Sequence, residues 1–230
     1  MQQSPFYEFI RLVVSGNGDE VSHRLTTDPT LAKEAAKVAA TRQNAHEYFF
    51  EEISHYLYTG DTALHMAAAA FSLPIAELLI SNGALVQAKN HRGATPLHYA
   101  SDSDRGAPEE QAAVIKFLIA SGAEPNAVDS SGVAPLHRAV RKRSAAAVRS
   151  LLDAGADPFK RNVSGSTPLH LAVQTTGSSG SGSERAHEQQ PLIIGLLLDR
   201  GASPTDKDKS GKRVIDAATS ERIRNLLISR

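Results

Sequence analysis

The sequence predicts an all-α protein in which a helix–turn–helix unit is repeated along the chain. The phrase Gly-x-Thr-Pro-Leu-His, in which x is any residue, occurs four times in this form or a close variant, beginning at Gly60, Gly93, Gly132 and Gly165. A second phrase, a Leu-Leu or Leu-Ile pair separated by two residues from Gly-Ala, closes each unit. Two of the intervals between the first glycines are 33 residues, and the third is 39. Two motifs that recur in phase indicate a repeat protein.

Each phrase has a local structural meaning. Gly165 supplies the backbone freedom that a tight turn needs. Thr167 has a side-chain oxygen that can cap a helix, and Pro168 suits the first helical position. The Leu pair of the second phrase predicts the buried end of another helix, and the Gly that follows suits a left-handed C-terminal cap. Each unit is therefore expected to contain two helices and one turn.

The phrase Thr-Pro-Leu-His-x-Ala at a period of 33 resembles the ankyrin-repeat family, from about residue 58 to the end. The resemblance implies an ankyrin-repeat solenoid of about six units with short hairpin loops, the end units being atypical caps. It also implies a binding face on the concave side, formed by hairpin tips and first helices. In that family the motif histidine forms hydrogen bonds to backbone groups near the turns and so connects adjacent units. The histidines at this position are His65, His98, His137 and His170.

The two ends depart from the repeat. Residues 1–57 are expected to form a degenerate N-terminal capping repeat plus an aromatic-rich insert, 58–208 four repeats, and 209–230 a C-terminal capping repeat. The spacing of Phe6, Phe9, Ile10 and Val13 predicts a helix. A turn and a short second helix follow. Asp28-Pro29 then predicts a further helical stretch from Thr30 to about Ala40.

Residues 41–58 do not fit the repeat and hold five of the chain's twelve aromatic residues. This density favours an extended or hairpin segment, with a helix as the alternative. A lid that packs over the first repeat is the favoured interpretation, and part of a partner site is the second. The segment also carries four candidate metal ligands, but no other residues here have ligand spacing. They are His46, Glu51, Glu52 and His55.

The composition argues against several classes of function. The chain has 25 basic and 25 acidic residues, which argues against general binding to nucleic acid or membrane surfaces. It has no cysteine and no long apolar run, so a cytoplasmic protein is expected. The atypical repeats at the two ends cap the array, so we also expect a monomer. No phosphate-binding loop or nucleophile-elbow phrase is present, and we expect no enzyme activity, cofactor or metal. Residues 176–183 are Gly/Ser-rich and predict a flexible linker.

The predicted function is a non-catalytic protein-interaction module that binds a partner protein or peptide through the concave groove. The alternative is a ligand- or metal-responsive regulatory protein that uses the 41–58 insert. Tyr and Arg often dominate interface energies, and the expected ligand is an acidic segment with an apolar anchor. Ordinary structural roles stay open for the basic residues: Asp102 can pair with Arg141, and 141–143 can be a solvated helix end. The candidate partner-binding residues are Tyr58, Met66, His91, Tyr99, Arg138, Arg141, Leu171 and Gln174, with Lys142 beside them.

Overall fold

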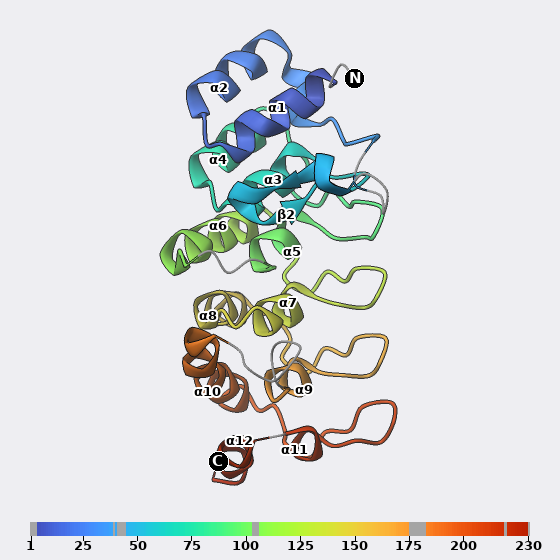
Figure 1. The fold of residues 1–230 in the computed structure, drawn as a ribbon, viewed down its shortest axis with the longest axis vertical. Coiled ribbons are helices and arrows are strands. Elements are labelled where there is room, and N and C mark those ends of the chain that lie inside the picture. The colour runs from blue at the N-terminus through green and yellow to red at the C-terminus, as the bar shows by residue number, and fades with distance from the viewer. Residues whose placement is uncertain are drawn as a thin grey trace. The chain divides into compact units, whose positions relative to one another are not determined.

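A computed structural model describes residues 4–38, 40, 45–102, 106–174, 183–218 and 220–229. The chain divides into two compact units, residues 1–124 and 125–230, which we call the N-terminal and the C-terminal unit. Figure 1 shows that each unit is built from pairs of helices joined by turns. The predicted linker at 176–183 lies outside the described residues except for Ser183, which caps the following helix.

The N-terminal unit consists of helices with one small two-stranded sheet. Its α-helices are α1 (Pro5–Val14), α2 (Gly18–Thr27), α3 (Ala63–Ala70), α4 (Leu73–Ser81), α5 (Pro96–Ser101) and α6 (Pro108–Ala120). Its 3₁₀ turns and strands are η1 (Pro29–Ala32), η2 (Ala45–Tyr48), β1 (Phe49–Phe50), η3 (Glu51–Ile53) and β2 (His55–Tyr56).

The described part of the C-terminal unit is helical. Its elements are α7 (Pro135–Arg141), α8 (Ala145–Asp153), α9 (Pro168–Ala172), α10 (Glu184–Leu198), α11 (Val214–Ala217) and α12 (Glu221–Ile228). The short first helices α7 and α9 pack against each other, and so do the second helices α8 and α10. At the end of the chain, Val214, Ile223 and Leu227 are buried, whereas Ile215 and Leu226 are only partly covered.

The N-terminal capping helices form as their apolar spacing predicts. Phe9, Ile10 and Val13 of α1 are buried, and Ser4 caps this helix by accepting from the Tyr7 amide at 3.2 Å. The predicted helix from Thr30 to about Ala40 is wrong. In the described residues of this stretch, 30–38 and 40, the single 3₁₀ turn η1 is the helical element that forms.

Residues after this 3₁₀ turn are extended because the next repeat offers their backbone partners. The amide of Ala36 donates to the carbonyl of Asp61 at 2.8 Å, and the amide of Gly60 donates to the carbonyl of Ala36 at 2.8 Å. Ala35 also forms an antiparallel bridge with Thr62. The segment therefore joins the cap to the first repeat by a sheet-like ladder.

Each repeat begins with a threonine or alanine cap that is completed by the motif histidine. The Thr62 amide donates to His65 Nδ1 at 3.1 Å, so the proton of the neutral ring lies on Nε2. Nε2 then donates to the carbonyl of Ala94 in the next repeat at 3.1 Å. His137 contacts the carbonyl of Ser166 in the same way at 3.3 Å. For these two histidines the inter-repeat role implied by the family is confirmed.

The turn glycines allow neighbouring loops to approach closely. Gly60 has a φ of 85°, and a Cβ added there would lie 2.9 Å from the Cα of Asn90. Because glycine has no Cβ, the two loops come close enough for the His91 amide to donate to the Thr59 carbonyl at 3.0 Å. In the C-terminal unit, a Cβ added at Gly165 would lie 2.7 Å from the backbone nitrogen of Lys209. Any side chain at these positions would therefore separate adjacent repeats.

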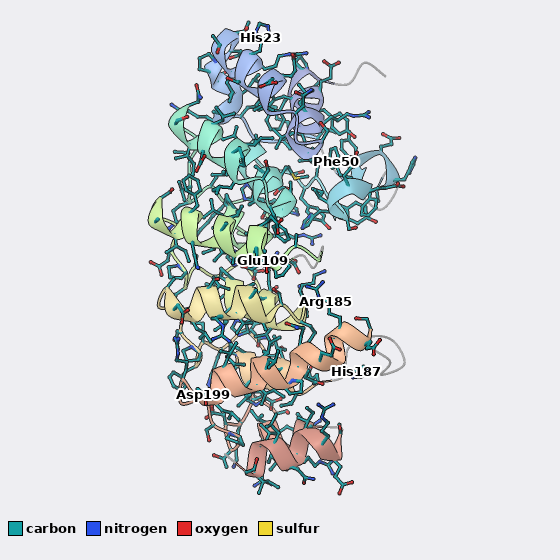
Figure 2. The ribbon with its side chains drawn as sticks, turned by 90° about the vertical axis from the view of Figure 1, so that its left-hand side faces the viewer. His23, Phe50, Glu109, Arg185, His187 and Asp199 are labelled. Atoms are coloured by element: carbon teal, nitrogen blue, oxygen red, sulfur yellow. The ribbon has the colours of Figure 1, made fainter. Side chains whose placement is uncertain are left out.

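The aromatic insert forms the small sheet of the N-terminal unit. Strands β1 and β2 are antiparallel, with Phe49 opposite Tyr56 and Phe50 opposite His55. Ser54 adopts the left-handed conformation in the turn, at a φ of 49°. The prediction of a hairpin is confirmed, and Figure 2 shows Phe50 in this hairpin at the side of the helices of its unit.

Candidate functional site

The hairpin of residues 49–56 covers part of the predicted binding face. The His55 ring stacks on the Tyr99 ring at a centroid distance of 4.4 Å, and His65 meets the same ring edge-on at 5.0 Å. Tyr99 is 1% exposed and Met66 is fully buried. These two predicted contact residues are therefore part of the interior, because the insert and the adjacent repeats enclose them.

A buried carboxylate fixes the insert to the repeats beneath it. Asp61 is fully buried, and both of its oxygens accept from the Tyr99 hydroxyl, at 2.7 and 2.8 Å. The Asn90 side-chain amide donates to Asp61 at 2.9 Å, and the Tyr58 backbone amide donates to it at 2.6 Å. A buried charge is tolerated when such donors satisfy it. The network joins the insert, the first repeat and the second repeat.

The outer side of the hairpin continues into the tip of the next loop. We call the residues Phe49, Tyr56, Tyr58, His91 and Arg92 the hairpin–finger surface. The Phe49 and Tyr56 rings are 4.7 Å apart, and the Tyr56 and Tyr58 rings are 6.1 Å apart. Tyr58 also lies 6.0 Å from the His91 ring. The Arg92 guanidinium carbon lies 4.3 Å from the centroid of the Tyr58 ring.

Two of the four predicted residues in this unit, Tyr58 and His91, remain accessible. Phe49, Tyr56 and Arg92 are not among the residues predicted from the sequence. The available signals were the density of aromatic residues in the insert and the place of Arg92 between His91 and the turn glycine Gly93. They were insufficient because the hairpin that joins them is not part of the repeat.

In the C-terminal unit, the predicted partner-binding residue Arg138 is largely buried. Its guanidinium pairs with the Asp129 carboxylate at 2.9 Å, and the two side chains are only 11% and 10% exposed. Asp129 also accepts from the amides of Ser131 and Val133 at 2.9 and 3.0 Å. Burial alone would raise the pKa of Asp129, but these hydrogen bonds outweigh it and the pKa is lowered. Arg138 therefore serves to stabilise the loop of its own repeat.

The interpretation of residues 141–143 as a solvated helix end is wrong for Arg143. This side chain is 4% exposed and donates to the carbonyls of Ala172 and Gln174. It caps α9, whose last carbonyls need donors. Burial lowers the pKa of Arg143 to about 10. The residue has a φ of 58°, a conformation that is uncommon for any residue other than Gly.

In the described part of the C-terminal unit, accessible side chains lie at the adjoining ends of α7 and α9. Arg141 and Lys142, at the end of α7, are exposed, as is Gln174 after α9. Leu171 of α9 is partly exposed. We call Arg141, Lys142, Leu171 and Gln174 the basic surface. It combines two cations, one amide and one apolar side chain.

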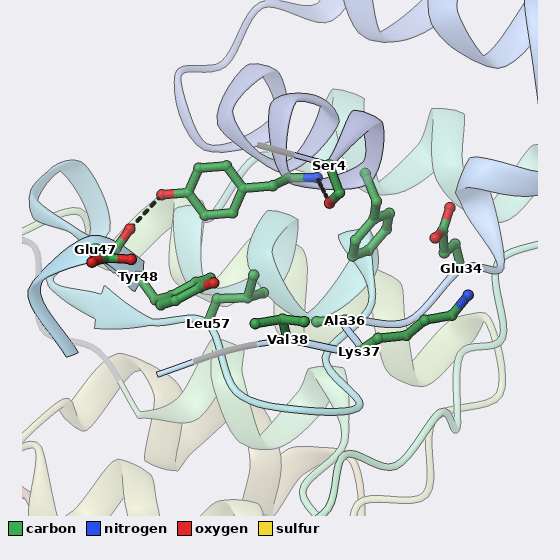
Figure 3. Close-up of a pocket in the computed structure, with 10 residues that line it drawn as sticks. Ser4, Glu34, Ala36, Lys37, Val38, Glu47, Tyr48 and Leu57 are labelled. Atoms are coloured by element: carbon green, nitrogen blue, oxygen red, sulfur yellow. Dashed lines mark hydrogen bonds between the residues drawn. The ribbon is translucent and has the colours of Figure 1, made fainter. Parts of the chain in front are cut away.

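A separate cavity of about 730 Å³ lies in the N-terminal unit, between α1, the extended residues 34–38 and the insert (Figure 3). Tyr7 lines this cavity, and its hydroxyl donates to the Glu47 carbonyl at 2.6 Å. Burial raises the pKa of Tyr7. The described lining residues are Ser4, Phe6, Tyr7, Glu34, Ala36, Lys37, Val38, Glu47, Tyr48 and Leu57.

The residues that the structure describes hold neither a metal site nor a membrane-spanning helix. No three His, Cys, Asp or Glu side chains of this part of the chain come together as a metal site. His55, one of the candidate ligands in the insert, stacks on Tyr99 instead. Within the same residues, no helix has both the length and the apolar character needed to cross a membrane.

Paired helices joined by glycine turns, with histidines that bond the next repeat, define a helical repeat protein. The family model described as "Ankyrin repeats (3 copies)" matches residues 36–110 and 107–208. The chain therefore belongs to the ankyrin-repeat family. Ankyrin repeats generally act as protein–protein interaction modules, and the family is typically non-catalytic.

One curated relative is the E3 ubiquitin-protein ligase KEG of Arabidopsis thaliana. It is 30% identical over 139 residues, which cover 58% of this chain. The match spans only 8% of the length of the ligase. The similarity thus concerns a small part of that protein.

Proposed function

We propose that this protein is a non-catalytic interaction module that binds an acidic segment of a partner protein through its basic surface. The single observation that carries this proposal is the exposure of Arg141 and Lys142 beside the partly exposed Leu171. Arg138, at the start of the same face, is already engaged with Asp129 and is not required for it.

The chemistry of the basic surface favours a carboxylate-rich ligand with an apolar side chain. A guanidinium can hold a carboxylate through two parallel hydrogen bonds, and a lysine adds a flexible point charge. Leu171 supplies an apolar contact, and the Gln174 side chain can both donate and accept. The charges of such a ligand would orient it on the basic surface, and its apolar side chain would add buried contact area.

The proposal can be tested by selecting peptides of about twelve residues from a random phage-displayed library on the full chain. We expect acidic peptides with an apolar residue, and titration calorimetry would give their affinities. The double charge reversal Arg141→Glu/Lys142→Glu should weaken binding at least about tenfold, corresponding to about 1.4 kcal/mol. Recovery of peptides without acidic residues would contradict the proposal.

A matched control is available on the second helices of the same unit. Arg149 on α8 and Arg222 on α12 are both exposed. The double variant Arg149→Glu/Arg222→Glu makes the same change in net charge away from the basic surface. It should leave the affinity within about twofold, whereas an equal loss would show a non-specific charge effect.

The cavity at Tyr7 favours a second candidate function, a module that responds to a small aromatic ligand. Its volume of about 730 Å³ lies within the range of small-molecule sites, and Tyr7 and Tyr48 meet edge-on at 5.6 Å at its side. A ligand bound only by the folded state raises its stability. We therefore expect an aromatic fragment library to contain compounds that raise the melting temperature.

A variant that obstructs the cavity tests this second candidate function. Val38 lines it and is 66% exposed, so Val38→Trp should obstruct it without disturbing the core. The variant should lose the stabilisation by fragments, and Val163→Trp, at another exposed valine, should keep it. Fragments that stabilise Val38→Trp as much as the unmodified chain would exclude the cavity.

A further inference from the structure

We propose that the hairpin–finger surface is a second docking site, specific to an acidic protein segment with an aromatic or apolar side chain. Arg92 binds the acidic group, and the rings of Phe49 and Tyr56 receive the anchor. The inference rests on the proposed function only in that the chain is an interaction module. It concerns a different surface, which lies entirely in the N-terminal unit.

The hairpin changes what a partner can contact in this unit. Tyr99 and Met66 are buried, so the first helices do not offer them to a ligand. The Asp61 network holds the hairpin in this position through Tyr58 and Tyr99. A ligand that approaches here must therefore contact the outer side of the hairpin and the neighbouring loop tip.

Arg92 is oriented for binding before a ligand arrives. It lies in a turn where its amide donates to the Asn90 side chain at 2.9 Å, and its guanidinium is 4.3 Å from the Tyr58 ring centroid. Stacking on an aromatic ring leaves the N–H groups at the edge of a guanidinium available to a carboxylate. Among the residues that the structure describes, the Arg92 side chain has no hydrogen bond or ion pair, and it is exposed.

The aromatic residues beside Arg92 form a surface suited to an anchor. Phe49 and Tyr56 are paired across the strands at 4.7 Å, and both are partly exposed. Tyr56 extends this surface to Tyr58, on which Arg92 stacks. Aromatic residues with a nearby Arg are the side chains that most often carry interface energy, and rigid rings lose little entropy on binding.

Charge selects an acidic partner over a basic one. The loop tip carries two cations, Lys89 and Arg92, and both are exposed. The Asp61 carboxylate is buried and accepts from three groups, so it does not reach the surface. Three exposed glutamates flank β1, with Glu47 before it and Glu51 and Glu52 in the turn after it, so the acidic group of the ligand is expected at the loop tip and only its anchor on the hairpin.

The experiment uses the same phage-displayed library and the full chain, with selected peptides compared on Arg92→Glu. We expect a class of acidic peptides whose dissociation constants rise about ten- to hundredfold in Arg92→Glu, the range for hydrogen bonds to charged groups. These peptides should bind Arg141→Glu/Lys142→Glu within about twofold. Arg92→Lys, which keeps the charge but loses the planar group, should show an intermediate loss.

A photocrosslinking residue, p-benzoylphenylalanine, placed at position 56 locates the ligand directly. It should crosslink to these peptides, and the same residue at exposed position 192 on α10 should not. Lys116→Glu, on the exposed side of α6, is the charge control in the same unit. Circular dichroism melting of every variant shows whether it remains folded.

The outcomes separate this inference from the proposed function. If every selected peptide depends on Arg141 and Lys142 and none on Arg92, the inference fails and the proposed function stands. If the library yields peptides that depend only on Arg92, the inference stands and the basic surface is excluded. Recovery of no acidic peptide overturns both. Displacement of the Arg92-dependent peptides by a single-stranded oligothymidylate of similar length at equal concentration would also overturn the inference, in favour of a nucleic-acid site.

Discussion

Tyr99 in the N-terminal unit and Arg138 in the C-terminal unit occupy the same position, directly after the motif histidine. Each is bound to an aspartate, but the two aspartates differ in place. Tyr99 reaches Asp61 in the preceding repeat, whereas Arg138 reaches Asp129 in the loop of its own repeat. The first contact holds an insert over the helices, and the second rigidifies one loop. One repeat position thus serves cohesion between repeats in one unit and local stability in the other.

The largest effect is expected from Tyr99→Ala. The change removes a fully buried ring and leaves Asp61 without its closest side-chain donor, so we expect a loss of about 4 kcal/mol in the free energy of unfolding. Urea denaturation followed by circular dichroism measures it. Tyr99→Phe, which removes only the hydroxyl, should cost about 1 to 3 kcal/mol. Equal stability of Tyr99→Ala and the unmodified chain would show that the hairpin is not fixed by this network.

A smaller effect is expected from Arg138→Ala, because its partner Asp129 keeps two backbone donors. We expect a loss of about 1 to 2 kcal/mol. A double-mutant cycle with Asp129→Ala should give a coupling energy above about 0.5 kcal/mol. Additive losses would instead mean that the two side chains act independently.

The pH dependence of stability should be carried in part by His137 and His170. Burial lowers the pKa of both, so the folded state binds their protons less tightly than the unfolded chain does. Their contribution is complete above the unfolded pKa, about 6.5, and is lost as the pH falls below it. The free energy of unfolding in urea should therefore be lower at pH 5.5 than at pH 7.5.

His137→Gln should make this dependence weaker, while His23→Gln, at an exposed position on α2, should leave it as it is. A steeper dependence in His137→Gln would contradict the assignment.

The smallest effect on stability is expected from Arg141→Glu. The residue lies one helical turn from Arg138 but is exposed, and exposed charges contribute about 0 to 1 kcal/mol. Thermal unfolding should shift by only a few degrees at most. A destabilisation as large as that of Arg138→Ala would remove the distinction between the two arginines.

The regular parts of the fold could be predicted because each of their residues repeats a local rule. The turn glycine, the capping position and the Leu pair place α3, α4, α7 and α8 close to where they lie. The prediction of a helix after Pro29 was wrong because the backbone there is held extended by the carbonyl of Asp61 and the amide of Gly60. No local sequence pattern reveals these two partners.

The candidate site was only partly predictable for a related reason. The period identifies which residues lie on one face, so it places Tyr58 and Arg141 at the surface. It does not reveal that the insert covers Tyr99, or that Arg138 and Arg143 turn inward to an aspartate and to helix-end carbonyls. These outcomes depend on contacts between residues that are far apart in the sequence.

The Asp61 carboxylate also constrains how this array can be lengthened. The residue that follows the turn glycine is acidic in the first repeat alone, since the other repeats have Ala94, Val133 and Ser166 there. Its partner Tyr99 belongs to the next repeat, so a consensus repeat spliced between residues 61 and 99 would leave a buried anion facing a foreign side chain. The junction between these two repeats is therefore indivisible, and a designer adding modules should choose a later one.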